Sequence, residues 1–79
     1  MKLAEILSTF VEGDYQVTLH LYERGVPEEW LRTFNCNDKS EFYSHRIRAN
    51  KMYGDYEVVS VKVCDRHGFL PEVIIKIKE

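Results

Sequence analysis

Long hydrophobic runs, export signals and cysteines are all scarce in this 79-residue sequence. No apolar run approaches the roughly 18 residues that a membrane-spanning helix needs. Glu5 interrupts the N-terminus where a signal peptide would be continuously apolar, so we expect a protein that is not exported. The 2 cysteines are too few for a disulfide scaffold, and the cytoplasm keeps thiols reduced. These absences predict a cytoplasmic protein with free thiols and no membrane partner.

Glycine and excess charge are also limited. The 4 glycines are scattered singly, so none of them belongs to a loop that could cradle phosphate. The 11 basic and 13 acidic side chains give a net charge of -2, which argues against a surface wholly devoted to nucleic acid. The chain shows no repeat, low-complexity tract or linker, so residues 1–79 are predicted to form a single domain.

The last third of the chain carries the strongest pattern. Residues 56–63 and 72–78 are two alternating β-rich runs on either side of the turn signal at residues 65–68, which is typical of an antiparallel hairpin. A register in which paired residue numbers have an even sum places the branched aliphatic side chains of both runs on one face. We predict that six of them meet beneath an N-terminal helix: Val59, Val61, Val63, Val73, Ile75 and Ile77.

The N-terminal stretch has the spacing of an amphipathic helix. Apolar side chains recur at i, i+3, i+4 and i+7 from Leu3, and Gly13 can close the helix, so a helix is expected over about residues 2–12. Alternation in residues 15–22 predicts a strand. The fold class is therefore α+β, with the helix packed on a mainly antiparallel sheet of three to five strands that ends in a C-terminal β-hairpin. The predicted core adds Leu3, Ile6, Leu7, Phe10, Val17, Leu19 and Leu21 to the six hairpin residues.

Residues 26–53 leave alternatives open. Residues 26–31 fit one helical turn with Pro27 at its first position, whereas residues 30–36 fit a second strand with Trp30 and Phe34 on one face. We favour the strand, because a sheet of only two strands is marginally stable. Beyond it, Asp38 or Ser40 can cap a short helix through about His45, and an irregular or extended segment is the alternative for residues 39–53.

Three stretches carry a resemblance to known proteins. They are Lys2-Leu3-Ala4-Glu5-Ile6-Leu7, Tyr53-Gly54-Asp55-Tyr56-Glu57-Val58-Val59-Ser60-Val61 and Val73-Ile74-Ile75-Lys76-Ile77. In this layout the chain resembles small uncharacterised α+β proteins encoded by phages and mobile elements of bacteria. The resemblance covers both ends and not the middle. It implies a small α+β fold and a phage-related setting, and it carries over no active site.

Cysteine and histidine are the candidates for chemistry. Cys64 and His67 have the spacing of two zinc ligands, but Cys36 and His45 do not supply the expected second pair. Cys64 could act as a nucleophile beside His20 if their two strands were neighbours, yet no oxyanion glycines or strained elbow accompany them. We therefore predict a non-enzymatic protein with no catalytic residues, metal site or cofactor.

A basic segment supports a nucleic-acid hypothesis. Residues 31–53 carry five basic side chains against two acidic ones. Cations interleaved with aromatic rings are what single-stranded nucleic acid uses for backbone neutralisation and base stacking. Since a solvated basic face explains the same pattern, nucleic-acid binding is the alternative function. Its candidate residues are Arg46, Arg48, Lys51 and Tyr53.

The second face of the sheet, turned away from the core, is the more informative feature. We expect it to be more apolar than a fully solvated face, so something should cover it. Within the chain the candidate cover is the middle segment with Trp30, Phe34 and Phe42; from outside it is a second copy in a homodimer or a target protein. We predict a binding or assembly protein that uses this face for protein-protein contact. Its candidate interface residues are Tyr22, Tyr56, Val58 and Ile74.

Overall fold

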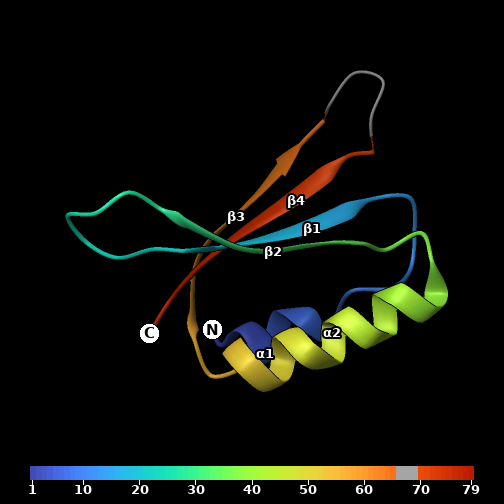
Figure 1. Ribbon diagram of the computed structural model, residues 1–79, viewed down its shortest axis with the longest axis horizontal. Coiled ribbons are helices and arrows are strands. Elements are labelled where there is room, and N and C mark those ends of the chain that lie inside the picture. The colour runs from blue at the N-terminus through green and yellow to red at the C-terminus, as the bar shows by residue number, and fades with distance from the viewer. Residues whose placement is uncertain (66–69) are drawn as a thin grey trace.

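The computed structural model describes residues 1–65 and 70–79. Among these residues, two helices and four strands follow one another along the chain (Figure 1). Their bounds are α1 Leu3–Leu7, β1 Gln16–Leu21, β2 Glu29–Asn35, α2 Lys39–Tyr53, β3 Glu57–Cys64 and β4 Glu72–Lys78. The chain therefore has the α+β fold class that its sequence predicts.

The four strands form one mixed sheet in the order β2-β1-β4-β3. β1 pairs antiparallel with β2, and β3 pairs antiparallel with β4, while the central strands β1 and β4 run parallel. The predicted C-terminal hairpin and the mainly antiparallel sheet are confirmed. Residues 66–68 of the predicted turn lie outside the described residues. Because β1 and β4 are central, β2 and β3 are the two edge strands.

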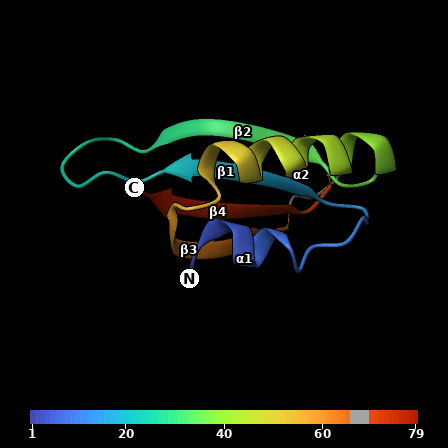
Figure 2. The same cartoon turned by 90° about the horizontal axis from the view of Figure 1, so that it is seen from below.

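Both helices lie on the same side of the sheet. Figure 1 shows them below the strands, and the view from below in Figure 2 places α2 in front of β1 and β2 and α1 on the β3 side. The opposite side of the sheet therefore carries neither described helix. No helix in the described part of the chain is long and apolar enough to cross a membrane.

The core lies between the helices and the sheet. Ile6, Phe10 and Val73 pack against it as partly buried side chains, and Leu21 is half-buried. Most of the predicted core from α1, β1 and β4 is thus confirmed. The fully buried cluster is Leu3, Leu7, Val17, Leu19, Phe34, Cys36, Phe42, Ala49, Ile75 and Ile77.

Three valines of β3 depart from the prediction. Val59, Val61 and Val63 are 42 %, 44 % and 67 % exposed. Val61 and Val63 pair with Ile75 and Val73, so they project from the side of the sheet that carries the helices. They remain exposed because β3 is an edge strand and α1 is too short to cover it. The prediction that all six hairpin aliphatics are buried beneath the helix is therefore wrong for β3.

A bulge near the start of β3 divides its register. From Ser60 to Cys64, paired residue numbers have an even sum, as predicted. The shift between Val58 and Ser60 adds one residue to β3, so that Val58 pairs with Ile77. Because Ile77 is buried in the core, Val58 lies on the helix side of the sheet and not on the second face.

The middle segment forms the predicted strand, β2, rather than a helical turn. Its Cα pairing with β1 skips Leu31, so Trp30 lies opposite His20 while Phe34 lies opposite Val17. Residues that are opposite one another project from the same face. The prediction that Trp30 and Phe34 share a face is therefore wrong, because the bulge turns Trp30 to the side away from the core.

The N-terminal helix is shorter than predicted and ends at Leu7. The hydroxyl groups of Ser8 and Thr9 donate 2.7 Å hydrogen bonds to the carbonyl oxygens of Glu5 and Ile6. Such local side-chain bonds compete with the helical ladder. The Phe10 amide then bonds to the Leu7 carbonyl, a tighter turn than the α-helix makes.

The second helix is longer than the short helix that the sequence favoured. Asp38 caps it, since its carboxylate accepts a 2.9 Å hydrogen bond from the Glu41 amide. The helix continues to Tyr53, and the Gly54 amide closes it on the Asn50 carbonyl. Its exposed apolar residues Ile47 and Met52 explain why no clear amphipathic pattern marks its length.

Candidate functional site

The side of the sheet that neither described helix covers is the candidate site, called here the open face. The register assigns to it residues from all four strands. The predicted cover from within the chain is absent among the described residues, because Phe34 and Phe42 are buried in the core on the other side. The open face includes Thr18, His20, Tyr22, Trp30, Thr33, Ser60, Lys62, Glu72, Ile74 and Lys76.

Trp30 is the most prominent side chain of the open face, with 61 % of its surface exposed. Its indole Nε1 donates a 2.8 Å hydrogen bond to Thr33 Oγ1. Thr33 and Thr18 share a 2.9 Å hydrogen bond across β2 and β1, and Thr18 Oγ1 donates to Glu72 Oε2 at 2.7 Å. A chain of hydrogen bonds therefore runs across three strands and holds the indole ring in a fixed orientation.

Opposite charges meet beside this chain of hydrogen bonds. Glu28 forms an ion pair with Lys76, and His20 Nδ1 lies 3.2 Å from Glu28 Oε2. Hydrogen bonds from Lys76 and His20 lower the pKa of the Glu28 carboxyl below its usual value. The Lys76 ammonium also lies 5.8 Å from the centre of the Tyr22 ring. The Lys76 ammonium is thus compensated by a neighbouring acid, which His20 also contacts.

The four interface residues predicted from the sequence divide into two pairs. Tyr22 and Ile74 lie on the open face, as expected. Tyr56 and Val58 do not, because both pack against the core cluster. Tyr56 makes an edge contact with Tyr53 at 5.4 Å between ring centres. Placing this pair on the second face was wrong, since the β3 bulge could not be seen in the alternation of the sequence.

The open face gains residues that sequence reasoning did not assign to an interface. Trp30 reaches it through the skipped Leu31, a feature that strand alternation does not reveal. His20 and Lys76 do follow from alternation, because both sit one residue away from buried positions of their strands. Next to Tyr22, at the end of β1, lies a hollow of about 560 Å³. It is lined by Leu21, Tyr22, Glu23, Arg24, Lys78 and Glu79.

The basic segment is only partly available for a ligand. Arg46 Nη1 donates a 3.1 Å hydrogen bond to the Phe10 carbonyl, and its guanidinium lies 5.1 Å from the ring centres of both Phe42 and Tyr43. Arg46 therefore ties α2 to the segment after α1. Tyr53 packs against the core. Of the four candidate residues for nucleic acid, Arg48 and Lys51 are the exposed pair.

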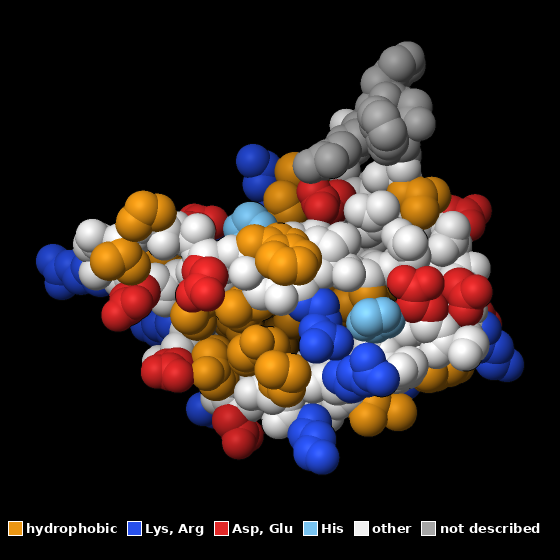
Figure 3. Space-filling view, in the orientation of Figure 1, with side chains coloured by type: hydrophobic (Ala, Val, Ile, Leu, Met, Phe, Trp, Pro, Cys, Tyr) orange, Lys and Arg blue, Asp and Glu red, His pale blue; other side chains and the backbone are white. Residues whose placement is uncertain are grey.

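Few basic side chains appear on the face that Figure 3 shows. Some of them lie near one another below the centre of the view, beside a histidine and hydrophobic side chains. Arg32 lies opposite Leu19, on the side of β2 that faces the helices. Its guanidinium lies 3.4 Å from His45 of α2 and also contacts Met52. A nucleic-acid footprint would instead need clustered cations along one groove or stripe.

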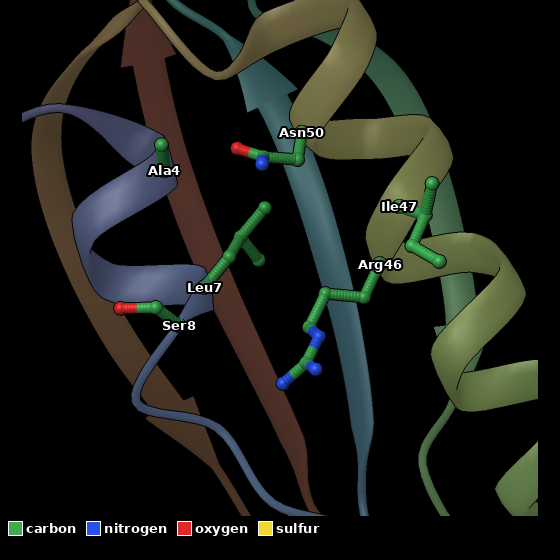
Figure 4. Close-up of a pocket in the computed structure, with 6 residues that line it drawn as sticks. All are labelled: Ala4, Leu7, Ser8, Arg46, Ile47 and Asn50. Atoms are coloured by element: carbon green, nitrogen blue, oxygen red, sulfur yellow. The ribbon is translucent and has the colours of Figure 1, made fainter.

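A small cleft separates the two helices. It has a volume of about 270 Å³ and is lined by Ala4, Leu7, Ser8, Arg46, Ile47 and Asn50. In Figure 4, Leu7, Arg46 and Asn50 point toward the space between α1 and α2, whereas Ile47 points away from it. Because Arg46 is held by Phe10 and two aromatic rings, the cleft has the character of a packing seam between helices.

The thiols and histidines do not form a reactive group in the described part of the chain. Cys36 is buried in the core, and burial raises the pKa of its thiol to about 11. Cys64 at the end of β3 is separated from His20 by β4, so the condition for their acting together, that their strands be neighbours, is not met. No group of three or more His, Cys, Asp and Glu among residues 1–65 and 70–79 could hold a metal ion. His67 of the zinc hypothesis lies outside these residues.

Comparisons with known proteins complete the description of the site. No protein-family model, curated protein or solved structure matches this chain. The class that the fold and the site define is a small α+β protein with two helices on one side of a mixed four-stranded sheet. The exposed tryptophan on its open face is the feature from which a function can be argued.

Proposed function

We propose that this chain is a non-enzymatic binding or assembly protein that uses the open face of its sheet to hold a partner protein. The observation that carries the proposal is Trp30, which is 61 % exposed yet held by the hydrogen bond to Thr33. A large aromatic ring in a fixed orientation loses little conformational entropy on binding, and tryptophan is enriched among the residues that dominate binding energy.

The surroundings of Trp30 favour a protein partner over nucleic acid. Tyr22 and Ile74 add apolar surface to the open face, and Thr33, the exposed threonine beside Trp30, can exchange its hydrogen bond for one to a partner. Lys76 is paired with Glu28, and Lys62, opposite Ile74 on β3, is a single further lysine rather than part of a basic cluster. An apolar centre with compensated charges around it is typical of protein interfaces, whereas nucleic-acid binding depends on excess cations.

The resemblance of both chain ends to phage and mobile-element proteins extends the proposal to a setting. In that setting the partner would be a phage or host protein. The proposal for the open face does not depend on this extension, because it rests on the placement of Trp30, Tyr22 and Ile74.

The proposal is tested by comparing three forms of the tagged protein in the cell that produces it: the unaltered chain, Trp30→Ala and Ile47→Ala. Ile47 is the matched control, because it is 66 % exposed but lies on α2, on the other side of the sheet. Each protein that the unaltered chain captures is then purified and titrated against all three forms. Removing a central aromatic anchor typically costs 2 kcal/mol or more, which is about a 30-fold weaker affinity.

We expect Trp30→Ala to weaken binding of at least one purified partner by about 30-fold, with Ile47→Ala within about twofold of the unaltered chain. Ile74→Lys should weaken the same partner, because it puts a charge in the middle of the open face. The proposal fails if every purified partner binds Trp30→Ala and Ile74→Lys as tightly as it binds the unaltered chain.

A further inference from the structure

We draw no further inference here: the strongest candidate, the exposed apolar edge of β3 around Val59, Val61 and Val63, is a surface patch for which nothing in the described part of the chain shows what covers it.

Discussion

Thr18 on β1 donates a 2.7 Å hydrogen bond to Glu72 on the neighbouring parallel strand β4, and both side chains are buried on the open face. Burying a carboxylate is costly unless donors satisfy it. Thr18 also shares a hydrogen bond with Thr33, to which Trp30 donates. The position of the exposed indole ring on β2 is therefore coupled to a buried polar pair on the next two strands, β1 and β4.

Thr18→Val should destabilise the protein by about 1 to 3 kcal/mol, because it removes one donor from the buried Glu72 carboxylate without changing side-chain volume much. Thr33→Val is the control. Thr33 is exposed, so water can replace its lost hydrogen bonds, and the cost should stay below about 1 kcal/mol. Urea unfolding measures both values. Equal costs would show that the Thr18–Glu72 contact contributes no more than a surface bond.

Arg46→Gln should destabilise the protein by about 1 to 3 kcal/mol, because it removes the charged hydrogen bond to the Phe10 carbonyl and the contacts with the Phe42 and Tyr43 rings. Arg48→Gln, on the exposed side of the same helix, should change the free energy of unfolding by less than about 0.5 kcal/mol. Thermal unfolding of the two variants measures this difference in stability. If they unfold alike, Arg46 is not the tie between α2 and the segment after α1.

The alternative function, nucleic-acid binding, depends on the exposed cations of α2. If the chain binds nucleic acid, the unaltered protein shifts single-stranded DNA or RNA in a low-salt gel, and the double variant Arg48→Glu with Lys51→Glu abolishes the shift. We expect no shift, because the cations of this helix are few and Arg46 is held by protein groups. A salt-sensitive shift that the double variant loses would favour the alternative over the proposed function.

The two thiols should differ in reactivity. Burial raises the pKa of the Cys36 thiol from 9.0 to about 11, so little thiolate forms near neutral pH, whereas Cys64 is half-buried at the end of β3. At pH 8, iodoacetamide should modify Cys64 first and Cys36 only after unfolding. Mass spectrometry of tryptic peptides identifies the modified residue. Rapid modification of Cys36 in the native protein would contradict its burial.

The same pKa shift sets an alkaline limit on stability. The folded state keeps the Cys36 thiol protonated beyond its ordinary pKa. The contribution of this thiol to the free energy of unfolding is therefore complete below about pH 9 and is lost as the pH rises through about 11. Tyr15, whose pKa burial raises to about 12, adds a loss in the same direction at higher pH. In Cys36→Ala, unfolding free energy should therefore fall less steeply between pH 9 and 11 than in the unaltered chain.

The hairpin and the N-terminal helix could be predicted from the sequence because each has a clear period. Alternation of period two in β3 and β4 gave the antiparallel pairing and the even register from Ser60 onward. This alternation carries no information about the order of the strands in the sheet. β4 is central and its aliphatics are buried, whereas β3 is at the edge and its valines are exposed, although the two runs read alike.

Bulges account for the errors in the candidate site. One extra residue at Leu31 turns Trp30 onto the open face, and one at Val59 turns Val58 toward the core. Each bulge reverses the face of every residue on one side of it, and neither is marked by a glycine or proline in the strand. Tyr22 and Ile74 were placed correctly because their strands reach them without a shift.

The most direct test of the open face is the fluorescence of Trp30, because it is the only tryptophan in the chain and its emission can be excited selectively over that of the tyrosines. In dilute monomeric protein we predict emission as red as that of free tryptophan in water and efficient quenching by acrylamide, both of which a purified partner should reverse. Blue-shifted emission shielded from acrylamide in the monomer would contradict the account, because it would mean that the chain itself covers this face.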